Sequence, residues 1–364
     1  MDTVDVEQIA EAVLYEGYLL FPYRRSALKN RQRWTFGGVY PRAYSEATGG
    51  SDPWRMQTQC LVVGNAETQL DIKVRFLQVI DRRVLTDVAG TLRPVEELRI
   101  DGQTYRPWEE AREREIRLRD TSGDRPLRLG DLLTTGRLFP ITIPAGSEEE
   151  PLRSSDGRDQ GILVHAWRAL WGDIEVAAEA LELPAEEREA LAPGEALYRV
   201  TVQIVNCTPW SEEGEEMPSR QEAVQQAFIS THTILRVEDG AFVSLLEPPD
   251  AYQRAAGECE NIKTWPVLVG EPGERHTLLS SPIILYDYPQ ISSESQGNFF
   301  DATEIDELLT LSVMTLTDDE KQEMRESDAH GRAILERTEL LSEEQIMKLH
   351  GVVRYLQPTR REGA

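Results

Sequence analysis

The sequence has few cysteines and none of the short motifs that mark the commonest enzyme classes. Only three cysteines occur among 364 residues, and no CxxC pair is present, which excludes a zinc ribbon and a thioredoxin-type redox motif. The patterns GxSxG, GxxxxGKS/T, GxGxxG and HExxH are also absent. Serine hydrolases with a nucleophile elbow, phosphate-loop enzymes, dinucleotide-binding folds and zinc proteases are therefore not indicated.

The sequence also lacks a long apolar run and a secretory signal. No hydrophobic stretch approaches the length that spans a membrane. The N-terminus, MDTVDVEQ, is acidic, whereas a signal peptide begins basic and continues apolar. We therefore expect a cytoplasmic protein without a membrane contact, whose thiols are reduced.

Acidic residues dominate the charge. The chain has 64 Asp and Glu against 39 Lys and Arg, a formal net charge of -25 at pH 7. Such a charge repels nucleic acids and anionic membranes and favours solubility. Nucleic acid is therefore not an expected partner, and any anionic partner would have to be met at a local basic surface.

One segment reverses this charge. No Asp or Glu occurs between Glu16 and Glu46, and the gap is rich in basic and aromatic residues. The candidate contact residues for a partner or an anion are Tyr23, Arg24, Arg25, Lys29, Arg31, Arg33 and Trp34. Arginine binds carboxylate and phosphate through paired donors, and aromatic rings supply stacking faces. Alternatively, these arginines pair with acids of the same chain and the rings fill a core.

Hydrophobic periodicity predicts an α+β fold that is rich in antiparallel strands, with a helical N-terminal segment and a helical C-terminus. Residues 196–206 alternate strictly, so that Tyr198, Val200, Val202 and Ile204 form the buried face. A small hairpin is expected over 98–105 and another over 228–246, turning at 238–240. Residues 109–120 fit either a solvated helix or an edge strand. Many short alternating strands indicate a sandwich-like sheet arrangement.

Composition suggests four regions. Residues 1–144 would form an N-terminal α+β domain that contains the basic-aromatic segment. Residues 145–160, rich in Gly, Ser, Pro and charge, are expected to be a linker. Residues 161–300 would form an antiparallel β domain, followed by C-terminal helices over 301–364. The capping box Thr317-Asp-Asp-Glu320 predicts a helix from 318 to about 337, and a second box at 342–345 predicts another.

A second candidate site lies nearer the C-terminus. Acidic residues cluster between 281 and 307, where a pocket against the N-terminal segment could gather His232, Asp287 and Asp301. Such groups could act as an acid and base or hold a small anion or hard metal. Helix capping explains Asp301 equally well, and the five histidines show no metal-ligand spacing. We expect no metal, no other cofactor and no assignable catalytic residue.

Several segments resemble a family of uncharacterised bacterial proteins encoded beside nickel-iron hydrogenase genes. The matching strings are YEGYLLFPYRRSALKNRQRWTFGGVYP, STHTIL, SPIILYDYPQ and FFDATEIDELLTLSVMTLTDDEKQEMR. Because the strongest of them lie toward the two ends, the resemblance would extend over nearly the whole chain. The resemblance implies a role in hydrogenase maturation or assembly, with a hydrogenase subunit or maturation factor as partner. It implies no activity for any residue. CxxC pairs and His-rich tracts, which are usual in metal-handling proteins of that pathway, are absent, and this argues against a direct nickel carrier.

From these observations we expect a non-enzymatic accessory protein that binds a protein partner through the basic-aromatic segment. The alternative is an enzyme or small-anion-binding protein with a pocket between the N-terminal segment and residues 281–307. The two hypotheses require different structures. Partner binding requires exposed cations without acidic partners in the same chain, whereas an enzyme or anion-binding protein requires a concave site where polar side chains converge.

Overall fold

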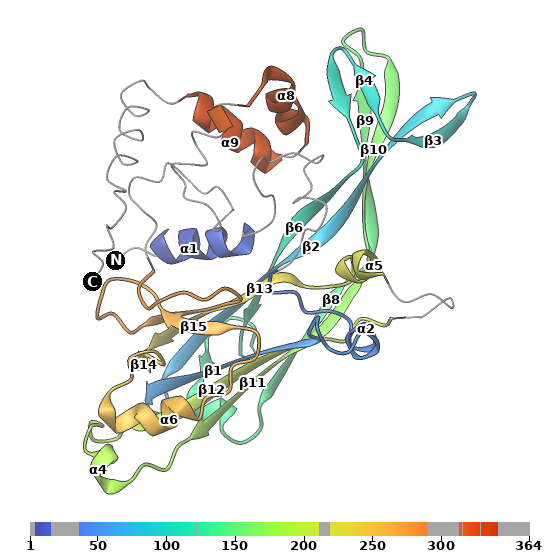
Figure 1. Ribbon diagram of the computed structural model, residues 1–364. Helices are drawn as coiled ribbons and strands as arrows, with labels where there is room; N and C mark the ends of the chain where they lie inside the picture. Colours follow the sequence, from blue (N-terminus) through green and yellow to red (C-terminus); the bar gives the residue numbers. More distant parts are fainter. Residues whose placement is uncertain are drawn as a thin grey trace, which may run out of the picture. The chain divides into compact units, whose positions relative to one another are not determined.

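The computed structural model describes residues 4–15, 36–120, 122–210, 219–289, 313–314, 316–327 and 329–340 (Figure 1). The chain divides into two compact units. The larger contains Met1–Glu16 and Trp34–Ile291, and the smaller contains Gly17–Arg33 and Ser292–Ala364. Each unit is described below by itself.

Two antiparallel sheets form the larger unit. The first has five strands in the order β14 (Ala241–Val243), β1 (Arg55–Gly64), β12 (Ala196–Asn206), β11 (Leu170–Ala180) and β8 (Arg137–Ile143). The second has β15 (Trp265–Leu268), β16 (Thr277–Ser281), β13 (Ile229–Glu238), β2 (Gln69–Val88), β10 (Asp159–Trp167) and β9 (Gly146–Arg153) in order. Three further strands pair with β2: β3 (Thr91–Val95), β6 (Trp108–Leu118) and β7 (Leu127–Arg128).

The main core lies between the two sheets. Alternate residues of β12 face inward, and Tyr198, Val200, Val202 and Ile204 are all buried, as the alternation predicts. They join one hydrophobic cluster with Ile72, Val74 and Phe76 of β2, and with residues of β1, β11 and β13. The predicted β-rich α+β fold with antiparallel, sandwich-like sheets is therefore confirmed.

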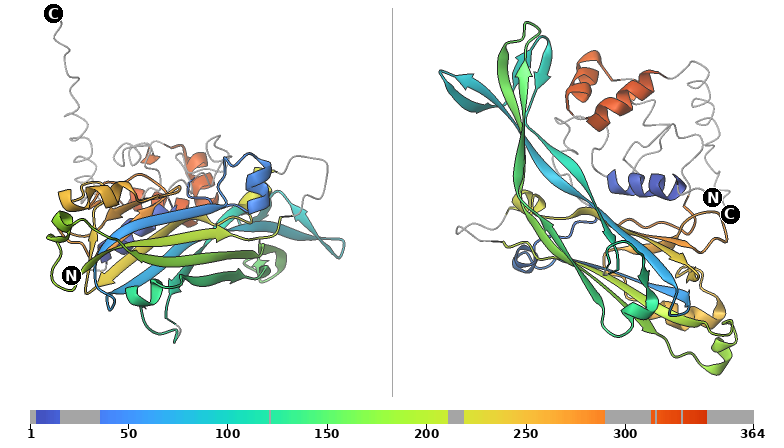
Figure 2. Two further views of the ribbon diagram at one scale, coloured as in Figure 1. Left: turned by 90° about the horizontal axis from the view of Figure 1, so that it is seen from below. Right: turned by 180° about the vertical axis from the view of Figure 1, so that it is seen from behind.

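Beyond the sandwich, the far ends of β2, β9 and β10 continue together with β3 and the hairpin of β4 (Leu98–Ile100) and β5 (Gln103–Tyr105), as Figures 1 and 2 show. This β4–β5 hairpin was predicted from its Asp101-Gly102 turn. A small separate core of Val84, Ile100, Leu152 and Leu163 holds these strand ends together. The charged segment 109–120, ambiguous in the sequence, contributes to β6, which pairs with β2 over eleven residues.

Two chain crossings between the sheets meet at Thr68. The chain leaves β1 for β2 at one crossing and leaves β13 for β14 at the other, and each crossing changes sheet. The hydroxyl of Thr68 accepts a hydrogen bond from the Asn65 amide at 2.9 Å and donates one to the Asp239 carbonyl at 2.7 Å. Gly64 and Gly240 leave the space that this buried side chain fills, since a Cβ at either glycine would collide with Thr68. The predicted hairpin over 228–246 is wrong, because β13 and β14 belong to different sheets.

Short helices connect the strands, and one longer helix covers the second sheet. The longer helix is α1 (Val4–Tyr15), as predicted, and Val6, Ile9 and Val13 pack against Ile234 of β13 and residues of β15 and β16. The short helices are α2 (Arg42–Ala47), α3 (Leu129–Leu132), α4 (Ala185–Arg188), α5 (Arg220–Val224), the 3₁₀ turn η2 (Asp250–Tyr252) and α6 (Gln253–Gly257).

The predicted domain boundaries need correction. The expected linker at 145–160 is β9 and the start of β10, which pair with each other and lie in the same sheet as β2. Both expected domains, 1–144 and 161–300, contribute strands to both sheets and fold as one unit. Charged residues are usual on an edge strand such as β9, which explains its linker-like composition.

The smaller unit contains two described helices, α8 (Asp318–Ser327) and α9 (Ala329–Glu339). The predicted capping box is present: the Glu320 amide donates to the Thr317 hydroxyl at 3.3 Å, and the Thr317 amide donates to the Glu320 carboxylate at 2.9 Å. The expected single helix over 318–337 is wrong, because α8 and α9 pack against each other and Arg325 pairs with Glu339 at 2.8 Å. The predicted box at 342–345 lies outside the described residues.

Candidate functional site

The predicted basic-aromatic contact residues, Tyr23, Arg24, Arg25, Lys29, Arg31, Arg33 and Trp34, lie outside the described residues. The described end of the same acid-free stretch shows both kinds of residue. Tyr40 and Tyr44 are buried, with ring centroids 5.7 Å apart. The Arg220 guanidinium donates to the Tyr40 hydroxyl at 2.5 Å, and Tyr44 donates to Asp52 at 3.2 Å. Burial raises the pKa of both phenols. These two rings therefore anchor the chain and are not displayed for a ligand.

The arginine between these tyrosines faces outward. The Arg42 side chain is 62% exposed and pairs with Glu46 at 2.7 Å. Its guanidinium carbon lies 4.6 Å from the ring centre of Trp54, and that of Arg55 lies 5.5 Å from the same ring. Both distances are within the range of cation–π attraction, so the Trp54 ring interacts with two guanidinium groups. In residues 36–45, the described portion of the acid-free stretch, the one cation, Arg42, thus lies at the surface and both phenols are buried.

His232 occupies a different environment from the predicted pocket. The side chain is fully buried on β13, opposite Arg75 of β2 and beneath α1. A bulge between Ile229 and His232 brings the Ser230 carbonyl within 2.9 Å of Nδ1, which donates to it. Burial, assisted by Arg75 and Lys73, lowers the pKa of His232 to about 4. Among the described residues, Nε2 has no hydrogen-bond partner.

A layer of ion pairs surrounds this histidine and holds α1 on the sheet. Lys73 Nζ lies 2.7 Å from Glu7, while Arg75 lies 2.9 Å from Glu11 and 3.2 Å from Glu113. Both cationic side chains are nearly buried, so their acidic partners offset a large desolvation penalty. We interpret this layer as structural, because each buried cation is matched by carboxylates from α1 or β6.

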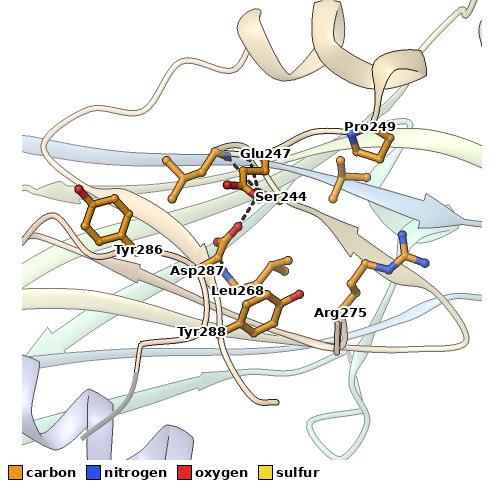
Figure 3. A pocket seen from close by; sticks show the side chains of 10 residues that line it. Ser244, Glu247, Pro249, Leu268, Arg275, Tyr286, Asp287 and Tyr288 are labelled. Carbon is orange, nitrogen blue, oxygen red and sulfur yellow. Dashed lines mark hydrogen bonds between the residues drawn. The ribbon is translucent and has the colours of Figure 1, made fainter. Parts of the chain in front are cut away.

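Asp287 does line a pocket, and the pocket lies between three segments of the larger unit (Figure 3). One carboxylate oxygen of Asp287 accepts from the Ser244 hydroxyl at 2.5 Å, and the other accepts from the Leu268 amide at 2.8 Å. The Ser244 oxygen in turn accepts from the backbone amides of Leu246 and Glu247, at 3.1 and 2.8 Å. These bonds hold the loop after β14, the end of β15 and the 286–288 segment together.

The pocket has a volume of about 320 Å³ and combines apolar, aromatic and charged residues. Tyr286 is 84% exposed at its rim and Leu246 is 52% exposed. The Tyr288 hydroxyl donates to the Glu274 carbonyl at 3.1 Å, which fixes its ring in the wall. Arg275 and Glu247 supply one cation and one anion, and Figure 3 shows Arg275 and Tyr286 on opposite sides of Asp287.

The hydrogen bonds of Ser244 fix its hydroxyl in the wall of this pocket. Both lone-pair directions of the Ser244 oxygen accept backbone hydrogen bonds, and its proton is held by Asp287, so the hydroxyl is not presented as a nucleophile. His232, the predicted acid or base, does not line this pocket, and Asp301 lies outside the described residues. In the described ranges, no group of three or more His, Cys, Asp or Glu side chains is placed to hold a metal ion.

Sequence reasoning identified Asp287 but missed Ser244, Glu247, Arg275 and Tyr286. One signal was present: Ser244-Leu-Leu-Glu247 has the spacing of a capping box, and the Ser244 hydroxyl does accept from the Glu247 amide. Arg275 and Tyr286 carry no local signal, because contacts distant in sequence bring them to Ser244: the Phe242 amide donates to the Arg275 carbonyl, and the Tyr288 amide donates to the Leu268 carbonyl.

No protein-family model matches the chain, and no curated protein sequence matches it significantly. None of the helices in the described part of the chain is both long and apolar enough to cross a membrane. The fold and the pocket together define an antiparallel β-sandwich protein with a small pocket beside the edge strands β14 and β15.

Proposed function

We propose that the protein is a non-enzymatic, cytoplasmic accessory protein that binds a protein partner through the basic-aromatic segment from Tyr23 to Trp34. The family resemblance suggests nickel-iron hydrogenase maturation or assembly as the setting, with a hydrogenase subunit or maturation factor as the partner. The net charge of -25 repels acidic surfaces from most of the protein. A partner with an acidic docking site would therefore bind preferentially at the basic segment.

One observation supports this proposal most directly. In the described part of the acid-free stretch, the aromatic and basic side chains differ in exposure. The phenols of Tyr40 and Tyr44 are buried, whereas the Arg42 side chain is largely exposed. Arg55, whose guanidinium carbon also lies near the Trp54 ring, adds a second exposed guanidinium group on this strongly acidic protein. Arg42 pairs with Glu46 of its own helix at 2.7 Å, whereas no described residue supplies an ion pair to the exposed Arg55, whose guanidinium donors can bind carboxylates of a partner.

The test is capture of the partner by matched variants. The partner is first identified by affinity capture from the native host with mass spectrometry, and is then purified. Arg24, Arg25, Arg31 and Arg33 are changed together to Ser. The control changes four exposed arginines of the strand ends beyond the sandwich to Ser: Arg83, Arg93, Arg153 and Arg158.

Both variants lose the same formal charge, so a difference between them reports position and not net charge. We expect the test variant to lose partner capture while retaining the wild-type circular dichroism and melting temperature, and the control to capture normally. Raising the salt concentration should weaken wild-type capture, since exposed charge contacts are screened. Equal capture of the partner by the test variant and the control variant would refute the proposal.

A second candidate function, the binding of a small ligand, is favoured by a separate observation. The pocket beside Asp287 contains a guanidinium, that of Arg275, for which no described residue supplies an ion pair or a side-chain hydrogen bond. Its volume of about 320 Å³ falls at the lower end of the range for small-molecule sites. This function depends on different residues from those that would bind the partner, so each can be tested alone.

A further inference from the structure

The pocket beside Asp287 presents two opposite charges that do not neutralise each other. Arg275 and Glu247 both line it, yet neither side chain forms an ion pair or a hydrogen bond within the described residues. Burial raises the pKa of the Tyr252 phenol, and the positive charge of Arg275 partly opposes that rise. A guanidinium and a carboxylate that share a cavity without contact leave a separation that a ligand with both charges could bridge.

The remaining lining defines the rest of such a ligand. Asp287 is a second carboxylate in the wall, but its two oxygens already accept from Ser244 and from the Leu268 amide. Its negative charge therefore adds to that of Glu247 and favours a cation on the same side of the ligand. Leu246 and Tyr286 are exposed large apolar side chains at the rim, and an apolar group of the ligand would remove their surface from water.

We infer that this pocket binds a free amino acid with an apolar or aromatic side chain. Arg275 would bind the carboxylate, Glu247 would bind the ammonium group, and the side chain would pack against Tyr286 and Leu246. A ligand with one charge satisfies only one of the two protein groups and is repelled by the other. The inference rests on the second candidate function and is independent of the partner proposal.

The experiment uses isothermal titration calorimetry on the full chain. The probes are L-phenylalanine and L-leucine, each compared with its carboxylate-only analogue (3-phenylpropionate, 4-methylpentanoate) and its ammonium-only analogue (phenethylamine, isopentylamine). We expect each amino acid to bind about tenfold more tightly than either analogue, the scale of one hydrogen bond to a charged group.

Two variants assign the charges. Arg275→Gln should weaken binding of the amino acids and the carboxylates about tenfold and leave binding of the amines unaffected or improved. Glu247→Gln should weaken binding of the amino acids and the amines about tenfold and leave binding of the carboxylates unaffected or improved. Both side chains are exposed, so neither variant is expected to unfold the protein, and unchanged melting temperatures would verify this. Arg93→Gln, in exposed strand β3, is the matched control and should bind like wild type.

The outcomes separate the inference from the function on which it rests. The inference is supported if Arg275→Gln weakens binding of the carboxylates and Glu247→Gln weakens binding of the amines. Analogues that bind as tightly as the amino acids would overturn the inference while leaving a small-ligand site. Absence of binding by every probe would overturn both the inference and the second candidate function.

Discussion

The buried histidine beneath α1 gives a prediction about stability and pH. His232 is fully buried, and its folded pKa is lowered from the ordinary 6.5 to about 4, mainly by burial. The unfolded chain takes up a proton near pH 6.5, whereas the folded chain takes it up only near pH 4. Between these values the unfolded state binds more protons, so acid favours unfolding. The contribution of the neutral imidazole is fully present above pH 6.5 and is lost as the pH falls toward 4.

The size of the effect follows from the shift. One pKa unit corresponds to about 1.4 kcal/mol, so the shift of His232 corresponds to about 3 kcal/mol lost between pH 7 and pH 4. Many carboxylates titrate in the same range, and they would obscure this loss in the wild type alone. The variant His232→Asn removes the titrating group and keeps a donor in reach of the Ser230 carbonyl. The difference in unfolding free energy between wild type and variant therefore isolates the histidine.

The assay is urea unfolding at pH 7, 6, 5 and 4, followed by tryptophan fluorescence. The wild type should be the more stable at pH 7, and its advantage over His232→Asn should shrink by about 3 kcal/mol by pH 4. If the difference in unfolding free energy between wild type and His232→Asn did not change with pH, the interpretation of His232 as a buried, neutral imidazole would be refuted.

Two further predictions concern the joining of the sheets. Thr68→Val keeps the shape of the side chain but leaves the Asn65 amide and the Asp239 carbonyl without their partner, so urea unfolding should show a loss of roughly 2–4 kcal/mol. The exposed Thr86→Val should change stability by less than about 0.5 kcal/mol, and equal effects would contradict the account. Gly172→Ala should lower the melting temperature, with a loss of about 2 kcal/mol, because its Cβ would lie 2.5 Å from the Val205 carbonyl and 2.7 Å from Phe228. Gly257→Ala lies at the end of α6, where an added Cβ would meet no atom within 4 Å beyond its own helix and chain neighbours, and it should be neutral or slightly stabilising. A larger loss there than at Gly172 would contradict the interpretation.

Local patterns predicted the elements that local physics determines. The alternation in 196–206 predicted the buried face of β12, the Asp101-Gly102 turn predicted the β4–β5 hairpin, and Thr317 with Glu320 predicted the start of α8. Each of these depends on neighbours within a few residues. The charge run at 109–120 left two choices open, because β6 is only half buried and carries polar residues on both faces.

The pairing of strands was not predictable in the same way. Alternation indicates which residues of a strand face inward, but it does not say which strand lies alongside. The hairpin expected over 228–246 failed for this reason, since the chain changes sheet at Asp239 and Gly240. The linker expected at 145–160 failed because an edge strand exposed to water has the same composition as a loop.

The candidate site was predicted only in part. Asp287 was selected for its charge, and the structure places it in a pocket with Ser244. His232 was selected for its hydroxyl neighbours, and the structure buries it elsewhere, because it shares a face of β13 with Ile234, which packs against α1. Arg275 and Tyr286 come together with Asp287 only through tertiary structure, to which a single sequence gives no access.

The most direct test of the central proposal is the dissociation constant of the purified partner, measured by calorimetry for wild type and for the variant with Arg24, Arg25, Arg31 and Arg33 changed to Ser. The account predicts that the variant binds more than tenfold more weakly at the same ionic strength, while the equally charged control variant matches the wild type. The same dissociation constant for all three proteins would contradict it.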